Sequence, residues 1–239
     1  MTDIVSIADS SLSARISATG AELVRLRDRH GLDLLWDGNP AFWTGRAPLL
    51  FPLVGEAKGN VIRVDGVAYG IPRHGFARTS HFALVARTPA ACTWRLEASE
   101  ATWRQYPFDF RLDVTYAIEG GVLHMTAEVT NKGNRIMPAS FGFHPALRWP
   151  LPYGKPRAGH EIVFERDESA PIRRPIGGLL SSARYPSPVR DRCLALHDGL
   201  FEDGAIVFDR LESRSLIYGG TMRVAFPDMP HLGIWTKPG

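Results

Sequence analysis

An alternation of apolar and polar residues with a period of two runs from residue 111 to residue 130 and restricts this stretch to β-structure. Its apolar positions are 112, 114, 116 and 118 before Gly120-Gly121 and 123, 125, 127 and 129 after it. Successive side chains of a strand point to opposite faces of a sheet, so the pattern predicts two strands that each have one buried side. The two glycines favour a tight turn, and the segment is therefore predicted to be a β-hairpin.

Short segments of the same kind recur along the chain. Residues 61–64 and 67–69 flank Asp65-Gly66, a pair that is typical of a type I′ turn and predicts a second hairpin. Further strands are expected at residues 22–27, 82–87, 92–97, 161–165, 205–208, 215–218, 222–226 and 232–235.

The arrangement of these segments indicates the fold class. Helical periodicity is nearly absent, and residues 99–105 are expected to form at most a short turn of helix. Residues 151–157 and 171–188 are rich in proline, glycine and serine and are interpreted as long loops. Many short strands between such turns predict an all-β antiparallel sandwich or barrel. No internal repeat occurs, so residues 1–239 are expected to form a single domain.

The composition is that of an ordinary globular protein, with 44% hydrophobic and 22% charged residues. No apolar run reaches the roughly 20 residues of a membrane-spanning helix, and the first residues lack the pattern of a secretory signal. A cytoplasmic protein with no membrane partner is therefore expected. Cys92 and Cys193 are the only cysteines, which excludes a disulfide framework. The net charge is only +3 and acidic residues lie among the arginines, so no nucleic-acid partner is expected.

Two histidines stand in short, stiff, aromatic motifs. Residues 72–78 read Pro-Arg-His-Gly-Phe-Ala-Arg, and residues 141–147 read Phe-Gly-Phe-His-Pro-Ala-Leu. Histidine gives or takes a proton near neutral pH with the least tuning of any side chain. The glycine after His74 permits close approach of a ligand to the backbone, and the proline after His144 favours an extended conformation. Because the two histidines lie 70 residues apart, only the fold can bring them together.

The residues alone leave several interpretations of this pair open. Aromatic faces beside proton donors suit a sugar ring, whose C–H faces are apolar and whose rim is polar. Two histidines at the edge of the core would account for the motifs equally well. A zinc site would need a third protein ligand, and no His-x-x-x-His or His-x-His spacing occurs, so no metal is expected. The other six histidines are interpreted as surface or capping residues.

Four blocks of sequence occur in a characteristic order. Residues 45–52 read Gly-Arg-Ala-Pro-Leu-Leu-Phe-Pro, residues 72–78 follow, residues 142–145 read Gly-Phe-His-Pro, and residues 208–213 read Phe-Asp-Arg-Leu-Glu-Ser. Together they resemble the aldose 1-epimerase (galactose mutarotase) family, and most closely its bacterial LacX-like branch, from about Ala18 to the last residue. The resemblance implies an antiparallel β-supersandwich and the interconversion of α and β anomers of a free hexose by acid–base ring opening, without a cofactor or metal. The implied partner is a small aldose sugar, bound by a monomer or homodimer.

Carried over position by position, the resemblance implies roles for five residues. His74 and His144 match the two active-site histidines of the family, and His144 is expected to donate a proton to the ring oxygen with His74 as its partner. Arg46 and Arg78 are candidates for hydrogen bonds to sugar hydroxyls. Asp203 is the candidate for an aspartate that binds hydroxyls in the family, although the next residue occupies the position expected to be acidic.

The resemblance also implies a general base that this sequence does not supply. In the family, the base is a glutamate beyond a segment like residues 232–239, whereas no glutamate follows Glu212 here. The domain is therefore expected to lack the family's C-terminal strands. A non-catalytic carbohydrate-binding protein on the same fold is one alternative, because it would not need the base.

A hexose-6-phosphate 1-epimerase is the other alternative. Such an enzyme would need arginines for the phosphate, for which Arg173-Arg174 or the pair Arg190 and Arg192 are candidates.

Overall fold

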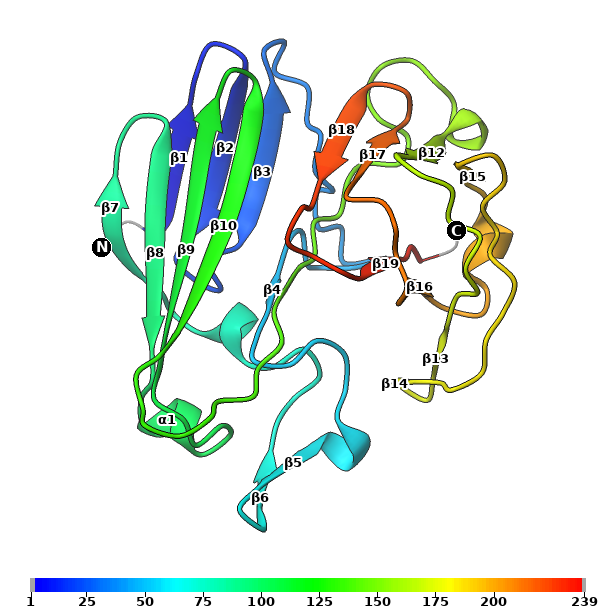
Figure 1. The fold of residues 1–239 in the computed structure, drawn as a ribbon. Helices are drawn as coiled ribbons and strands as arrows, with labels where there is room; N and C mark the ends of the chain where they lie inside the picture. The colour runs from blue at the N-terminus through cyan, green and yellow to red at the C-terminus, as the bar shows by residue number, and fades with distance from the viewer. Residues whose placement is uncertain (1–2, 238–239) are drawn as a thin grey trace. The chain divides into compact units, whose positions relative to one another are not determined.

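The computed structural model describes residues 3–237, and the chain forms two compact units that divide between Arg148 and Trp149 (Figure 1). The first two and last two residues of the predicted domain 1–239 lie outside the described residues. Nearly all regular structure is antiparallel β-strand, which confirms the predicted all-β antiparallel class. The expectation of a single domain stays a prediction. Among the described residues, no helix has the length and apolar character needed to cross a membrane.

Two antiparallel sheets build most of the first unit. Their strands are β1 (Ile4–Ala8), β2 (Leu12–Ser17), β3 (Leu23–Asp28), β7 (Ala83–Arg87), β8 (Ala91–Glu97), β9 (Phe110–Glu119) and β10 (Val122–Asn131). One sheet has the order β1-β2-β3 and the other the order β10-β9-β8-β7. Strand β1 contacts β8 and β9, and Figure 1 shows the two sheets packed against each other.

The core of the first unit lies between these sheets. Burial alternates along β9, where Leu112, Val114 and Tyr116 are fully buried. The Tyr116 hydroxyl donates a hydrogen bond of 2.6 Å to the backbone carbonyl of Ala21, which satisfies a polar group that would otherwise be costly to bury. Strands β9 and β10 pair along their whole length, so the hairpin predicted at residues 111–130 is confirmed.

Short elements complete the first unit. They are β4 (Leu49–Leu50), η1 (Lys58–Asn60), β5 (Val61–Val64), β6 (Val67–Gly70), η2 (Ala77–Thr79), α1 (Glu100–Trp103) and β11 (Gly142–Phe143). Strands β5 and β6 pair across Asp65 and Gly66, which both have positive φ, as a type I′ turn requires, and the second predicted hairpin is confirmed. The helical turn expected within residues 99–105 is α1, and Ser99 begins it with a capping box.

The second unit holds a four-stranded antiparallel sheet and two two-stranded pairs. The elements are β12 (Glu161–Phe164), β15 (Cys193–Ala195), β17 (Ser215–Tyr218), β18 (Met222–Ala225), β13 (Pro175–Ile176), β14 (Leu179–Leu180), β16 (Ile206–Phe208), β19 (Leu232–Ile234), η3 (Arg157–Gly159) and η4 (Asp198–Phe201). The sheet has the order β15-β12-β17-β18, while β13 pairs with β14 and β16 with β19. Phe164 and Phe208 are buried against each other, with ring centroids 5.4 Å apart.

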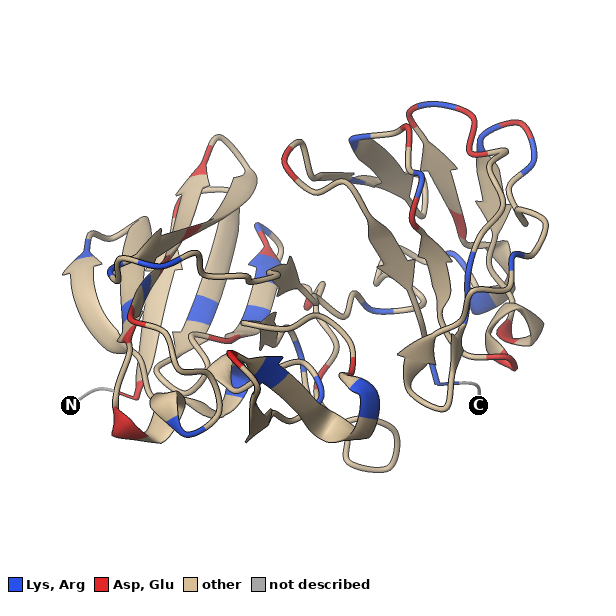
Figure 2. Ribbon diagram, turned by 60° about the horizontal axis from the view of Figure 1, so that its bottom comes forward, with Lys and Arg blue, Asp and Glu red and all other residues tan. Residues whose placement is uncertain are grey.

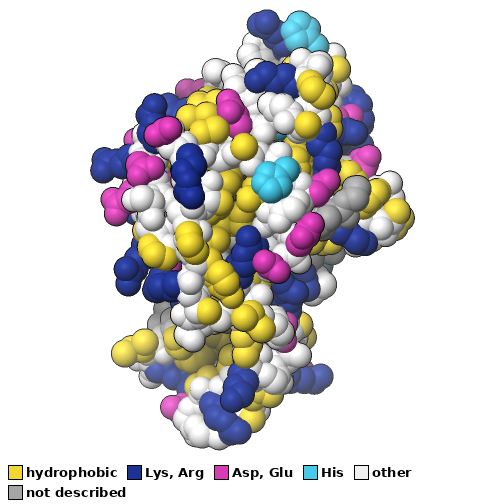
Figure 3. All heavy atoms as spheres, turned by 90° about the vertical axis from the view of Figure 1, so that its right-hand side faces the viewer, with side chains coloured by type: hydrophobic (Ala, Val, Ile, Leu, Met, Phe, Trp, Pro, Cys, Tyr) yellow, Lys and Arg dark blue, Asp and Glu magenta, His cyan; other side chains and the backbone are white. Residues whose placement is uncertain are grey.

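Charged residues of both signs are dispersed over each unit (Figure 2). On the face seen in Figure 3, exposed hydrophobic side chains lie among side chains of both charges. The exposed large apolar residues of the second unit are Tyr153, Ile176, Leu180, Tyr185, Ile217 and Trp235.

Candidate active site

Strand β4 brings the two histidine motifs together within the first unit. It pairs with β11 through Leu50↔Gly142 and Leu49↔Phe143, so His144 follows directly at the end of that pairing. The next residue of the β4 segment, Phe51, accepts backbone hydrogen bonds from the amides of residues 76 and 77 at 3.1 and 3.2 Å. The short β4 segment therefore contacts both motifs. Strand β4 pairs with β11, which leads into His144, and the following residue Phe51 bonds to the motif that contains His74.

Gly75 is the point of closest approach between the first motif and this strand. Its φ is +69°, a conformation that is costly for residues with a Cβ. A Cβ built at this position would lie 2.1 Å from the carbonyl oxygen of Phe51. Only glycine fits there, which explains the His-Gly sequence in structural terms.

His74 is held by two hydrogen bonds to one residue. Its amide donates to the carbonyl of Gly55 at 2.7 Å, and the amide of Gly55 donates to His74 Nδ1 at 3.0 Å. A neutral imidazole that accepts at Nδ1 carries its hydrogen on Nε2. Burial lowers the pKa of His74 to about 4, helped by the charges of Arg73, His144 and Arg78. The ring is therefore neutral at physiological pH and presents an Nε2–H donor.

His144 faces His74 and an aromatic ring. The centroids of the two imidazoles lie 6.1 Å apart, and the ring of Trp43 makes an edge contact with His144 at 5.2 Å. Burial lowers the pKa of His144, as do the charges of Arg73 and Arg78, against a hydrogen bond to its own backbone that raises the pKa. His144 Nδ1 is buried and has no hydrogen-bond partner in any other described residue.

Arg46 belongs to the same neighbourhood but is already engaged. Its guanidinium Nη2 donates to the carbonyl of Asp37 at 2.6 Å. Its backbone amide donates to the Glu22 carboxylate at 2.7 Å, and its carbonyl accepts from the amide of Ala146 at 2.7 Å. These bonds anchor Arg46 next to the segment that carries His144. The remaining N–H groups of the Arg46 guanidinium can donate hydrogen bonds to a ligand.

Arg78 and Arg73 supply positive charge around the pair. Arg78 is half-buried in η2, Arg73 is exposed, and both depress the pKa of both histidines. Neither guanidinium makes a hydrogen bond or ion pair with a described residue. Sequence reasoning identified Arg78 but missed Arg73, whose signal was its place directly before His74.

Asp203 lies in the second unit, exposed on the turn between η4 and β16. The other four predicted residues all lie in the first unit. Within the described part of the chain, no group of three or more His, Cys, Asp or Glu side chains is placed to hold a metal ion. The site therefore consists of two imidazoles with lowered pKa values and two arginines that have no ion-pair partner among the described residues.

Fold and site define an all-β protein in which two histidines from distant motifs lie close together. The family model for aldose 1-epimerase matches residues 3–213. The chain belongs to the aldose 1-epimerase family, as the sequence blocks predicted.

Individual relatives agree with this assignment. The chromosomal LacX protein of Lactococcus lactis subsp. lactis is 30% identical over 97% of this chain and 82% of its own length. The crystal structure of a galactose mutarotase related enzyme from Lactobacillus acidophilus superposes with a TM-score of 0.88 at 28% identity, covering 97% of this chain and 80% of that one. This confirms the galactose mutarotase-like fold. A putative glucose-6-phosphate 1-epimerase of Salmonella typhimurium is 30% identical over 46% of this chain and 38% of its own length.

Proposed function

We propose that this protein is an aldose 1-epimerase-type isomerase that interconverts the α and β anomers of a free hexose. The observation that carries the proposal is the imidazole pair, in which two motifs 70 residues apart in sequence place their rings 6.1 Å apart. Membership in the aldose 1-epimerase family supports an isomerase of this general kind.

The reaction moves one proton to the ring oxygen and removes one from the anomeric hydroxyl. As the C1–O5 bond breaks, O5 takes a proton from the protonated form of His144, which becomes neutral. A solvent water accepts the proton of the anomeric hydroxyl, and an open-chain aldehyde forms. Rotation about C1–C2 and attack of the O5 hydroxyl on the other face of the aldehyde reverse these steps. His74 donates a hydrogen bond from Nε2 to the same region of the substrate. Assistance of this kind is typically worth about 10²–10⁴-fold in rate.

The depressed pKa values bear directly on this role. A lowered pKa makes protonated His144 a stronger acid but reduces the protonated fraction near neutral pH. We therefore expect the rate to rise as the pH falls from neutral, because the protonated fraction of His144 increases.

Polarimetry of freshly dissolved α-glucose or α-galactose tests the proposal. The protein should speed mutarotation above the spontaneous rate, and His144→Ala should remove the acceleration. His124→Ala is the matched control, because His124 is exposed on β10 in the same unit and should leave the rate unchanged. Binding of aldoses without any acceleration would instead favour a non-catalytic carbohydrate-binding protein, and the absence of both binding and acceleration would refute the proposal.

A hexose-6-phosphate 1-epimerase is a second candidate, and the unpaired guanidinium groups of Arg73 and Arg78 favour it. Their charges disfavour the proton that His144 must carry. A phosphate on the substrate would pair with the arginines and restore this proton, so binding would activate the acid. The sequence similarity to the putative glucose-6-phosphate 1-epimerase supports this candidate.

Comparing glucose with glucose 6-phosphate separates the two candidates. If the substrate is phosphorylated, Arg78→Ala and Arg73→Ala should raise KM for glucose 6-phosphate and leave any activity on glucose unchanged or higher. Equal effects of these substitutions on both sugars would count against the phosphorylated substrate.

A further inference from the structure

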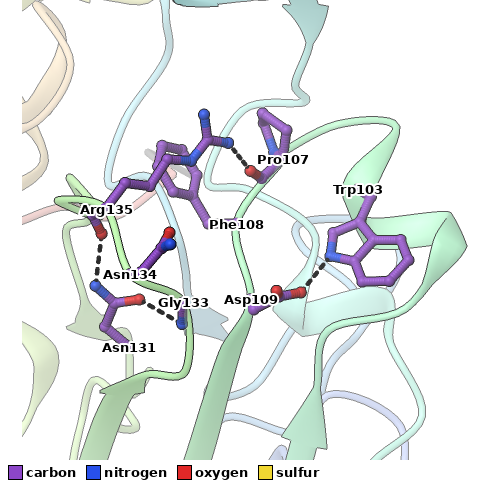
Figure 4. Close-up of a pocket in the computed structure, with 8 residues that line it drawn as sticks. All are labelled: Trp103, Pro107, Phe108, Asp109, Asn131, Gly133, Asn134 and Arg135. Atoms are coloured by element: carbon purple, nitrogen blue, oxygen red, sulfur yellow. Dashed lines mark hydrogen bonds between the residues drawn. The ribbon is translucent and has the colours of Figure 1, made fainter.

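The first unit contains a pocket that shares no residue with the histidine pair (Figure 4). It has a volume of about 280 Å³, close to the lower end of ligand-sized cavities, which begin at about 300 Å³. The pocket lies where α1, the start of β9 and the turn after β10 meet. Its lining residues are Trp103, Pro107, Phe108, Asp109, Asn131, Gly133, Asn134 and Arg135.

One wall of the pocket is an exposed tryptophan whose ring is fixed in place. Trp103 is 45% exposed, although large aromatic side chains tend to be well covered. Its indole Nε1–H donates to Asp109 Oδ1 at 2.9 Å, which sets the orientation of the ring. Figure 4 shows the indole on one side of Asp109 and the Gly133–Asn134 turn on the other. The ring is thus a fixed apolar plate beside a carboxylate.

The opposite wall of the pocket is also fixed by hydrogen bonds and an ion pair. Asn131 holds the turn by donating from Nδ2 to the carbonyl of Arg135 at 2.8 Å and by accepting from the amide of Gly133 at 3.0 Å. The guanidinium of Arg135 lies 4.4 Å from the ring centroid of Phe108 and pairs with Asp65 at 2.8 Å. Binding to such a preorganised site loses little conformational entropy.

Polar groups in the pocket are left for a ligand. The Asn134 amide and the second carboxylate oxygen of Asp109 have no hydrogen bond to a described residue. An amide supplies both donors and an acceptor, and a carboxylate oxygen accepts strongly. The charge of Arg135 is already matched by Asp65, and the Asp109 carboxylate repels anions. The free groups therefore select a neutral ligand rich in hydroxyl groups.

From these features we propose that this pocket is a second carbohydrate-binding site, which takes one neutral pyranose ring of a saccharide. The C–H face of the ring stacks on Trp103, while adjacent hydroxyls donate to Asp109 and exchange hydrogen bonds with Asn134. This site would hold sugar without turning it over, because no histidine lines it. It does not depend on the activity proposed for the histidine pair.

The test uses a sugar that cannot open its ring. Methyl β-glucopyranoside and methyl β-galactopyranoside are titrated into protein labelled with fluorotryptophan, and the ¹⁹F resonance of Trp103 is identified from its loss in Trp103→Phe. We expect this resonance to shift with a Kd on the order of 1 mM, a value usual for one small shallow site. Asp109→Asn keeps an acceptor for the indole N–H and replaces the free oxygen, so it should weaken binding at least about tenfold.

Two control variants test whether the shift of the Trp103 resonance comes from binding in this pocket. Trp235→Ala removes another exposed tryptophan, 43% accessible, and His144→Ala disables the proposed active site. Both should leave the shift of the Trp103 resonance unchanged. A Trp103 resonance that does not move with either glycoside, or that moves equally in Asp109→Asn, would overturn the proposal. Neither result depends on whether the protein accelerates mutarotation.

Discussion

Replacing Gly75 with alanine tests the packing that joins the two histidine motifs. The new Cβ would lie 2.1 Å from the oxygen and 2.5 Å from the carbon of the Phe51 carbonyl, which real Cβ atoms do not do. Phe51 must therefore move away from the first motif. The same carbonyl accepts the amides of Phe76 and Ala77, so the shift would also break these two hydrogen bonds.

The expected loss of stability has two parts. A residue with a Cβ at a φ of +69° costs roughly 1–2 kcal/mol. The loss of the two backbone hydrogen bonds to Phe51 adds about 0.5–1.5 kcal/mol to this cost for each bond. The free energy of unfolding should therefore fall by about 2–5 kcal/mol. Because His74 directly precedes Gly75, a shift of the backbone at Gly75 would also displace the His74 imidazole. The mutarotation rate should therefore fall as well.

Gly66→Ala provides the control. Gly66 has a φ of +81° and no atom within 4 Å of a built Cβ, so it carries only the conformational cost of about 1–2 kcal/mol. Urea unfolding followed by circular dichroism gives both values. If Gly75→Ala lost no more stability than Gly66→Ala, the close approach to Phe51 would not be what holds the motif.

The hydrogen bond from Gly55 to His74 Nδ1 predicts that His74→Asn folds better than His74→Ala. Asparagine tolerates the φ of +67° and offers an acceptor near Nδ1, whereas alanine leaves the Gly55 amide unpaired, which costs about 1–3 kcal/mol more in urea unfolding. The pKa of His74 also predicts a pH dependence. Between about pH 4 and 6.5 the unfolded chain holds a proton that the native His74 lacks, so the free energy of unfolding falls as the pH drops through this range and levels off below it. In His74→Asn this component is absent, so the stability of the wild type relative to the variant should decline from pH 6.5 to 4; a constant difference would contradict the shifted pKa.

Period-two patterning was sufficient to predict the long hairpin and the fold class. In β9, each apolar residue from Leu112 to Ile118 is buried, because one face of a strand pair packs on the core and the other meets solvent. Strands β1 and β2 were not predicted, although Val5 and Ile7 of β1 alternate with exposed residues in the same way and are buried. Patterns of four or five residues are simply harder to distinguish from chance.

The assembly of the site depended on features that have no sequence period. Strands β4 and β11 contain two residues each, too few for an alternation to be visible. Their pairing, with the contact of Gly75 on Phe51, is what turns two separate motifs into one pair. The sequence blocks predicted a role for His74 and His144, whereas only the fold shows that burial and nearby arginines lower the pKa of both.

A double-mutant cycle on the two imidazoles tests the central claim most directly. Anomer interconversion is measured for His74→Asn, His144→Asn and the double variant, with unfolding curves to verify that each is folded. Residues that act as a unit lose function non-additively, so each single variant should fall by about 10²–10⁴-fold and the double variant no further than the worse of the two. Losses that multiply, or a double variant that keeps the wild-type rate, would contradict a shared site of action.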